Sequence, residues 1–396
     1  MKGYAGKRVL IIVENLPVPF DRRVWHEATT LQQNGYEVTV ICPKTDSYNL
    51  SVEILEGVRI FRHPLPVEGN GAVGFLLEYS IALFWEFFLA LKLSFSRGFD
   101  IIHACNPPDT IFSIGLFFKL FGKKFIFDHH DINPELYEAK FSRRDIFYRL
   151  LCLAEKLTFR TANISIATNN SYQEIAVTRG GMNPDKVFIV RSGPDLNRLK
   201  RQQSNDEWKF GRKYMVGYVG VMGGQEGIDI LLNIVRHIVY DIGRHDITFC
   251  MVGGGPVLEE MREMSKSLKV EEYVHFLGRV DDQVYLDVLN SADLCVNPDT
   301  PNEMNDKSTM NKVLEYMALG KPIVQFDLTE GRYSCEEASL YAKCTEIEDF
   351  AEKVLELIDD DFKRKKMGKY GRERIEKGLS WESQSIKLLE AYDALR

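Results

Sequence analysis

Cysteine is sparse in this chain of 396 residues: there are seven, at scattered positions, and no two of them are spaced as C-x-x-C. The spacing therefore gives no sign of a zinc knuckle or a redox pair. Most of the cysteines lie in apolar, strand-like runs such as residues 246–255 and 293–298. We expect buried, reduced thiols, as in a protein that works in the cytoplasm.

An excess of positive charge is also missing. Lysine and arginine number 50 against 57 aspartates and glutamates, which gives a net charge of -7. This balance argues against a general nucleic-acid binder. With 45% hydrophobic and 27% charged residues, the composition is that of a globular protein long enough for two domains.

Long uninterrupted apolar runs are absent as well. The N-terminal residues lead directly into a short strand, so we expect no secretory signal. Residues 73–95 most resemble a membrane span, but three charges interrupt them: Glu78, Glu86 and Lys92. This segment and residues 111–124 form either a pair of core helices or a surface that contacts the inner face of a membrane peripherally. In the second case the headgroup contacts would come from Lys119, Lys123 and Lys124.

What is present is a regular alternation of β-branched runs with helical patterns. Strands are expected in the first half at residues 7–15, 36–43, 58–64, 99–107, 123–131, 162–169 and 186–194. In the second half they are expected at residues 214–222, 246–255, 273–280, 293–298, 321–327 and 339–343. The pattern predicts an α/β fold of two Rossmann-like, doubly wound parallel-sheet domains facing a cleft, which is the default ligand site.

A polar stretch at residues 197–213 has no sustained strand pattern and is interpreted as the linker. We therefore expect an N-terminal domain over residues 1–200 and a C-terminal domain over residues 201–380. Residues 381–396 show the spacing of an amphipathic helix, which we expect to pack on the N-terminal domain.

The segment at residues 305–322 combines helix-capping residue types with an amphipathic helix that ends at Gly320. Free N–H groups at a helix start bind anions, and Lys307 and Lys312 add positive charge. Glu315 follows on the same helix, where its carboxylate can accept hydrogen bonds from two ribose hydroxyls. An ordinary capped helix with a solvated glutamate explains the same residues equally well.

Residues 217–232 read as a strand, a glycine-rich turn and a helix. Glycines at 220, 223, 224 and 227 permit close backbone approach to a phosphate. The segment is neither a dinucleotide fingerprint nor a Walker loop, and a purely structural turn is the commoner explanation.

Polar residues also gather after the apolar strand at residues 123–131, which ends in Asp128, His129, His130 and Asp131. This cluster indicates acid–base work or metal binding, although the further ligands of a zinc site are not apparent. A strand-end histidine that only packs is the alternative. Near the N-terminus, Asp21 can cap a helix, and Arg22 and Arg23 can clamp a phosphate or a sugar acid on the acceptor side.

Taken in order, these stretches resemble the family 4 glycosyltransferases, retaining enzymes with the GT-B fold. The resemblance covers nearly the whole chain, and LEYMALGKPIV at residues 314–324 is its most specific motif. It implies transfer of a sugar from a nucleotide-sugar to an acceptor hydroxyl with retention, in polysaccharide or glycoconjugate synthesis. It implies no cofactor and no metal, because helix starts and basic side chains stabilise the leaving diphosphate. The acceptor is expected to be a sugar or a lipid-linked molecule.

The family's functional residues map onto this sequence one by one. Glu315 matches the ribose-binding glutamate, and His130, with Asp131 beside it, matches the histidine near the transferred sugar. The donor loops match at Gly223, Gly224, Ser308, Thr309, Met310 and Asn311, with Arg279 at the nucleobase.

Two departures from the family pattern stand out. The first glutamate of the E-x7-E motif is replaced by Lys307, and Asp306 is a candidate substitute. The basic pair of the second glycine loop is absent, which leaves Lys307 or Lys312 to supply positive charge. Two alternatives stay open. A nucleotide-sugar epimerase would have the same GT-B architecture, and the lost residues would fit a non-catalytic nucleotide-sugar-binding partner subunit.

Overall fold

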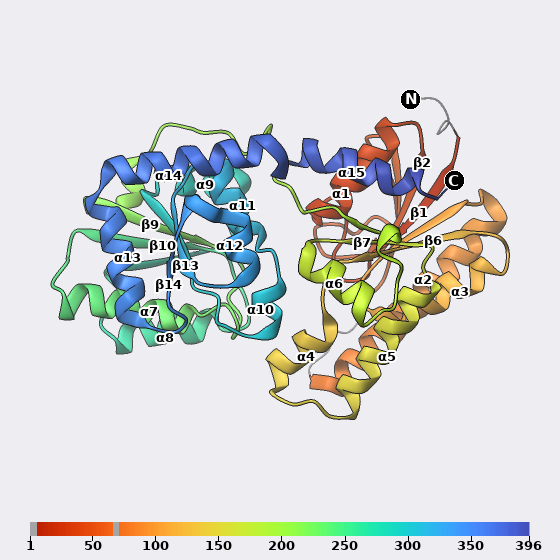
Figure 1. Ribbon diagram of the computed structural model, residues 1–396, viewed down its shortest axis with the longest axis horizontal. Coiled ribbons are helices and arrows are strands. Elements are labelled where there is room, and N and C mark those ends of the chain that lie inside the picture. Colours follow the sequence, from red (N-terminus) through yellow and green to blue (C-terminus); the bar gives the residue numbers. More distant parts are fainter. Residues whose placement is uncertain (1–5, 66–70, 396) are drawn as a thin grey trace. The chain divides into compact units, whose positions relative to one another are not determined.

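The computed structural model describes residues 6–65 and 71–395 and divides the chain into two compact α/β units (Figure 1). Unit 1 comprises Met1–Ser192 and Ser385–Arg396, and unit 2 comprises Gly193–Gln384. The division therefore falls earlier than the expected boundary at residue 200. The last helix, α15 (Trp381–Asp393), begins in unit 2 and ends in unit 1.

Unit 1 contains an eight-stranded sheet with the order β3-β4-β2-β1-β5-β6-β7-β8. Its strands are β1 (Arg8–Ile12), β2 (Glu37–Pro43), β3 (Val52–Leu55), β4 (Val58–His63), β5 (Ile101–Cys105), β6 (Lys124–His129), β7 (Ile164–Ala167) and β8 (Val187–Ile189). All neighbouring pairs are parallel except β3 and β4. Strands such as β5 are buried on both faces, which explains their nearly continuous apolar sequences.

The antiparallel edge strand β3 is a feature that the strand pattern did not predict. A two-residue turn joins it to β4, and both turn residues, Glu56 and Gly57, have positive φ angles of 48° and 83°. Such a turn has the twist that a tight hairpin needs, so the chain reverses at once instead of crossing over through a helix.

Helices cover both faces of the unit 1 sheet (Figure 1). They are α1 (Arg22–Gln33), α2 (Gly71–Ser96), α3 (Phe112–Lys119), α4 (Asn133–Phe141), α5 (Ile146–Thr161) and α6 (Asn170–Thr178), with short 3-10 turns η1 (Asp109–Ile111) and η2 (Pro184–Lys186). The end of α15 also belongs to this unit: the Tyr392 hydroxyl lies 2.8 Å from His103 Nδ1, and its ring meets that of Tyr36 edge-on.

The helix α2 covers the segment that most resembles a membrane span. Its stretch Leu77–Ser96 is long and apolar enough to cross a membrane, and 22% of the most apolar part is buried within the protein. Length and apolar composition are shared by membrane spans and by core helices of globular proteins. Its Glu86 is fully buried while Phe84 and Phe88 are exposed, so α2 has one packed face and one apolar exposed face.

Unit 2 contains a six-stranded parallel sheet with the order β11-β10-β9-β12-β13-β14. Its strands are β9 (Tyr214–Val219), β10 (Ile247–Val252), β11 (Val274–Gly278), β12 (Leu294–Asn297), β13 (Ile323–Phe326) and β14 (Ser339–Ala342). The strand order reverses between β9 and β12, and such a switch point is where open α/β sheets bind ligands.

The helices of unit 2 lie on both faces of this sheet (Figure 1). They are α7 (Ile228–Arg236), α8 (Leu258–Ser267), α9 (Asp282–Ser291), α10 (Glu303–Lys307), α11 (Asn311–Ala318), α12 (Thr329–Cys335), α13 (Ile347–Asp359) and α14 (Asp361–Arg374). Short turns or π-helical segments lie at η3 (Asp206–Lys209), η4 (His237–Asp241), η5 (Glu336–Ala338) and η6 (Ile375–Leu379).

Glycines allow the loops at the switch point to approach one another closely. A Cβ added to Gly253 would lie 1.8 Å from the Gly220 carbonyl oxygen, and one added to Gly227 would lie 2.1 Å from the Pro298 oxygen. Both Gly253 and Gly227 have positive φ, 134° and 64°. The expected glycine-rich turn is therefore required by packing as well as by backbone conformation.

Candidate functional site

The end of β6 places its polar side chains on opposite faces. Because side chains alternate along a strand, Asp128 lies on one face and His129 on the other. His129 is fully buried and packs against the rings of Phe159 and Tyr172. Burial, together with the nearby positive charge of Arg179, lowers the pKa of His129 to about 3, so this histidine is a neutral packing residue.

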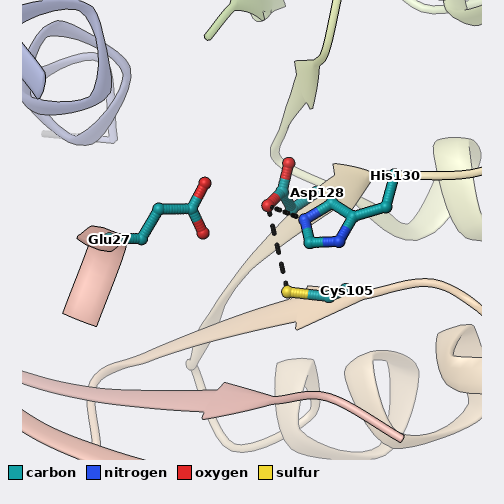
Figure 2. Close-up of side chains that lie close together, drawn as sticks. All are labelled: Glu27, Cys105, Asp128 and His130. Atoms are coloured by element: carbon teal, nitrogen blue, oxygen red, sulfur yellow. Dashed lines mark hydrogen bonds and ion pairs between the residues drawn. The ribbon is translucent and has the colours of Figure 1, made fainter. Parts of the chain in front are cut away.

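Asp128 is the centre of a buried charge cluster (Figure 2). Its Oδ1 accepts a hydrogen bond from Arg23 Nη2 at 2.8 Å, and its Oδ2 contacts His130 Nε2. Burial alone would raise the pKa of Asp128, but the charges of Arg23 and His130 outweigh it and hold the pKa well below its usual range. The carboxyl group is therefore ionised.

Two further residues reach the cluster from other elements. His103 on β5 has its Nε2 3.3 Å from Asp128 Oδ2, and Glu27 on α1 lies 3.2 Å from Arg23 Nη2. Figure 2 shows the Glu27 carboxyl turned toward Asp128. Burial and the charge of Asp128 raise the pKa of Glu27 well above its ordinary value, while Arg23 opposes the shift.

The cluster holds His130 in a defined orientation. The Asn106 side-chain oxygen accepts hydrogen bonds from the backbone N–H groups of His130, at 2.7 Å, and Asp131, at 3.2 Å. Arg23 Nε also lies 2.9 Å from His130 Nε2, and this nitrogen cannot accept from Arg23 while donating to Asp128. The closer contact with the carboxylate places the proton on Nε2, since two acceptors would repel. Nδ1 is then the ring nitrogen that does not contact Asp128.

The residues expected on the acceptor side are largely occupied within unit 1. Asp21 caps α1 by accepting from the Val24 N–H at 3.0 Å. Arg23 is buried, and its Nη1 donates to the Val190 carbonyl at 2.8 Å and to Ser192 Oγ at 3.2 Å. Arg23 thus acts as the counter-ion of Asp128 and supports His130, whereas Arg22 is exposed.

The ligating atoms of Glu27, Cys105, Asp128 and His130 lie within 4.8 Å of one another, as a metal site would require. The surroundings do not suit a cation, however. The Arg23 guanidinium already pairs with both carboxylates. Burial, with Asp128 and Glu27 nearby, raises the pKa of the Cys105 thiol well above its usual value, so it is not a thiolate ligand.

In unit 2, Glu315 on α11 is held from two sides. Its Oε2 accepts a hydrogen bond from the Tyr285 hydroxyl, and its Oε1 lies 3.4 Å from Arg198 Nη1. Arg198 also forms a two-point ion pair with Asp282, at 2.9 and 3.0 Å. The Glu315 side chain is 19% exposed, so the carboxylate is oriented by the protein yet reachable by a ligand.

The start of α11 differs from the capped helix that the sequence suggests. The N-cap residue is Met310, which makes no side-chain cap hydrogen bond. Asp306 accepts instead from the backbone N–H and the hydroxyl of Thr329, at 2.8 and 2.9 Å, and so supports the start of α12. Lys307 pairs with Glu303 one turn earlier on α10. The α11 start therefore offers backbone N–H groups to an anion.

Lys312 lies beside the loop after β9, where a Cβ added to Gly220 would be 3.6 Å from its Cδ. Its Nζ lies 2.6 Å from Asp299 Oδ1 and 5.1 Å from the centre of the Tyr218 ring. In the loop after β9, Glu226 accepts from the Gly223 N–H at 3.0 Å, while a Cβ at Gly224 would meet no atom within 4 Å. Arg279 is exposed and packs near Gly254, where an added Cβ would lie 3.4 Å from the arginine Cγ.

Comparison with known proteins identifies the family from both halves of the chain. Residues 21–198 match the model described as "Glycosyltransferase Family 4", and residues 213–360 match the one described as "Glycosyl transferases group 1". The chain belongs to the family 4 glycosyltransferases. The resemblance expected from the motif order is thereby confirmed, and the chain is a glycosyltransferase.

Relatives with known names are distant. A phosphatidyl-myo-inositol mannosyltransferase of Propionibacterium freudenreichii is 24% identical over 308 residues, which are 75% of this chain and 70% of the relative. The GPI3 subunit of the Saccharomyces cerevisiae phosphatidylinositol N-acetylglucosaminyltransferase is 25% identical over 149 residues. That alignment covers 35% of this chain and only 31% of the yeast subunit.

Solved structures confirm the GT-B fold of this family 4 member. Sucrose-phosphate synthase from Thermosynechococcus elongatus superposes with a TM-score of 0.79 at 17% identity, covering 98% of this chain and 99% of that one. Anabaena HepE in complex with UDP superposes with a TM-score of 0.71 at 15% identity, covering 98% and 99%.

Sequence reasoning missed several residues of this glycosyltransferase. His103 and Glu27 received no role, yet both reach Asp128, and Arg198 and Tyr285, which hold Glu315, were not singled out. For Arg198 a signal existed, because residues 190–199, with the sequence VRSGPDLNRL, are one of the stretches in which this chain resembles the family 4 glycosyltransferases. No local sequence pattern points to Glu27 or His103, because Glu27 on α1 and His103 on β5 approach Asp128 on β6 only when the chain folds.

Proposed function

We propose that this glycosyltransferase moves a sugar from a nucleotide-diphosphate sugar held by unit 2 to an acceptor hydroxyl, with retention and without a metal. The observation that carries the proposal is the start of α11, where the N-cap residue Met310 makes no side-chain cap hydrogen bond. Lys307 lies three positions before Met310 in the sequence, and Glu315 lies five positions after it. A helix start of this kind binds a diphosphate through its N–H groups.

The geometry of Glu315 supports a role in ribose binding. Tyr285 and Arg198 orient the Glu315 carboxylate, and the side chain stays 19% exposed. A carboxylate in such a position can accept hydrogen bonds from two neighbouring hydroxyls. Arg198 and Asp282 would keep the carboxylate in place, so the ordering cost on binding is small.

Charge compensation for the leaving diphosphate is assigned to backbone groups and Lys312. The Lys312 side chain is 11% exposed and lies beside Asp299. Burial lowers the pKa of Lys312, but the negative charge of Asp299 outweighs it and raises the pKa above its ordinary value. Its charge is therefore permanent at neutral pH. Lys307 is likewise paired with a carboxylate, that of Glu303.

In unit 1, His130 is proposed to contact the transferred sugar through Nδ1. Asp128, Arg23 and Asn106 keep its ring and backbone in one orientation. Asp131 stays a candidate for the same site; burial raises the pKa of its carboxyl, with His130 opposing. Metal independence is supported by the Arg23 guanidinium, which pairs with Asp128. Asp128 belongs to the only cluster of possible metal ligands found among the described residues.

The acceptor is proposed to be lipid-linked, with the enzyme in the cytoplasm and in peripheral contact with a membrane. The named relatives that support this act on phosphatidylinositol derivatives. On this chain, the exposed aromatic side chains Phe84, Phe88 and Phe95 on α2 support membrane contact. Lys119 does not, because its ammonium donates to the Thr161 carbonyl at 2.5 Å. Flotation with anionic liposomes tests the contact; protein left entirely in the dense fraction would exclude it.

The donor is identified by thermal unfolding against a panel of UDP-, GDP-, ADP- and TDP-sugars. A ligand that binds the folded state raises the midpoint by mass action, so the true donor stands out. Product analysis with that donor in EDTA then tests the reaction: we expect a new glycoside with the donor's anomeric configuration. An isomerised free donor would instead indicate an epimerase, and binding without turnover on any acceptor a non-catalytic subunit.

A further inference from the structure

Unit 1 contains an apolar cavity that the proposed donor chemistry does not use. Its volume is about 290 Å³, near the lower end of the range of small-molecule sites, roughly 300–1,000 Å³. Residues of α2, α4, α5 and η1 line it, and all four elements belong to unit 1. Figure 1 shows the three helices in that unit. Its apolar lining includes Leu83, Leu136, Phe141, Phe147, Leu150 and Leu151.

The outer part of this cavity continues into an exposed apolar surface. Phe147 and Leu150 line the cavity and are 38% and 51% exposed. On α2, Phe84 follows the lining residue Leu83 and is exposed, as is Phe88 one turn later. Apolar side chains that surround an open cavity and remain in contact with water are unfavourable unless a ligand or membrane covers them.

The inner part of the cavity is polar and connected to the His130 site. Asp109 lines it and is buried, and its two oxygens accept hydrogen bonds from the side-chain amides of Asn106 and Asn133, both at 2.8 Å. The same Asn106 amide donates to the Asp131 carbonyl, and its oxygen accepts from the His130 N–H. Two hydrogen bonds therefore join the cavity wall to the backbone that positions His130.

Two basic side chains reach the cavity: Lys140, and Arg143, whose guanidinium lies 5.6 Å from the ring centre of the lining residue Phe141. Lys140 lines it, and the loop that follows α4 carries the exposed residues Arg143 and Arg144, with the exposed Arg149 on the first turns of α5. Residues 138–149 contain these four basic residues and two acidic ones, Glu138 and Asp145. Glu138 pairs with Arg144, and Asp145 pairs with Arg143. The excess positive charge suits a phosphate attached to an apolar chain.

We propose that this cavity binds the hydrocarbon chain of a phosphate-bearing lipid acceptor, whose phosphate contacts Lys140 and Arg143. The inference rests on the proposed transferase function and adds to it the place where the lipid part of the acceptor binds. An acceptor with a hydrocarbon tail explains in one step the apolar lining, the exposed mouth, the basic rim and the link to the His130 backbone.

The test uses simple amphiphiles in calorimetry with the full chain. Dodecyl phosphate, kept below its aggregation concentration, is compared with butyl phosphate and inorganic phosphate. We expect dodecyl phosphate to bind at least about tenfold tighter than butyl phosphate, with a negative heat-capacity change, because the extra methylenes are buried. Lys140→Ala should weaken both alkyl phosphates while keeping their ratio.

Two variants of α5 form a matched pair. Leu150 and Leu153 are 51% and 52% exposed, but only Leu150 is among the described residues that line the cavity. Leu150→Asp should abolish the tenfold preference for the long chain, and Leu153→Asp should leave it within twofold of the wild type. Equal losses in both variants, or equal binding of the two alkyl phosphates by the wild type, would overturn the proposal.

The donor panel is run on the same two variants. A nucleotide-sugar that raises the unfolding midpoint of both shows that they are folded and that unit 2 is intact. If no donor acts on the wild type while the chain-length preference stands, the transferase proposal fails separately from the lipid site.

Discussion

Unit 1 and unit 2 share a parallel α/β architecture, but their strand ends differ. In unit 1, β6 leads into buried side chains that pair with one another, as Asp128 does with Arg23 and His130. In unit 2, β9 and β10 lead into glycine turns, where Gly253 and Gly220 approach closely. One unit presents oriented side chains, and the other presents backbone N–H groups.

This difference matches the two tasks of the proposed reaction. A diphosphate carries charge on many oxygens, which backbone N–H groups at loop and helix starts can meet collectively. A single sugar hydroxyl needs one group at one position, and a histidine held by a buried carboxylate supplies it. The comparison therefore predicts separable effects of mutations in the two units.

The largest effect is expected for His130→Ala. Loss of a positioned polar group at the reacting sugar should lower the transfer rate about 10²- to 10⁴-fold. Affinity for the free nucleoside diphosphate should stay within twofold, because that ligand binds in unit 2. Single-turnover kinetics and calorimetry measure the two quantities. An equal loss of nucleotide affinity would contradict the division of tasks.

A smaller effect is expected for Glu315→Gln. Removing the charge should weaken two hydrogen bonds to ribose and lower nucleoside diphosphate affinity about 10- to 100-fold, since hydrogen bonds to charged groups contribute about 1.5–3 kcal/mol. Glu303→Gln is the control, because that side chain is exposed and pairs with Lys307 on α10. Calorimetric titration of the nucleotide measures both variants; indistinguishable affinities would remove Glu315 from the ribose site.

A third prediction concerns buried carboxyls of unit 1. Burial, together with mutual repulsion between Glu14 and Glu86, raises the pKa of Glu86 to about 8. The folded state therefore binds more protons than the unfolded state between about pH 4.3 and 8. The free energy of unfolding should fall as pH rises through this window, by up to about 1.4 kcal/mol per pH unit for each such group, and level off above it.

Glu86→Gln should reduce that pH dependence and stabilise the protein at pH 8, because a neutral amide replaces a carboxyl that would otherwise ionise. Denaturant unfolding at several pH values measures the slope. The exposed Glu174→Gln on α6 serves as the control. If both variants keep the wild-type slope, the carboxyl of Glu86 does not titrate in this range.

The smallest effect is expected for Asp306→Ala. Asp306 supports the first residue of α12 through Thr329, so its loss should cost about 1 kcal/mol of stability. Donor affinity and turnover should be unchanged, because both carboxylate oxygens are turned to Thr329. A clear loss of turnover with the same donor would show instead that Asp306 replaces the missing first glutamate.

Much of the fold was predictable because its signals are local. Apolar runs that alternate with helical patterns indicate parallel sheets, and the strands at residues 123–131 and 214–222 appear in the structure as β6 and β9. The helix start at Asp21 and the helix end at Gly320 follow from the same short-range rules. The order of the motifs was sufficient to indicate the family.

Strand β3 and the start of α11 were not predictable in this way. A four-residue edge strand is too short to show a periodic sequence pattern. The turn that follows it places Glu56, which is not a typical turn residue, at a positive φ of 48°. At α11, residues of capping type precede the helix, but Asp306 bonds to Thr329, which lies 23 positions later.

The amino-acid sequence by itself determined the α/β class, the order of the motifs and the candidate residues His130 and Glu315, since these depend on residue type and spacing. Only the tertiary structure decided which side chains meet them. Arg23 and Asp128 are 105 positions apart, and they meet because α1 packs on the sheet that contains β6. Burial then determines their charges, which no local pattern can express.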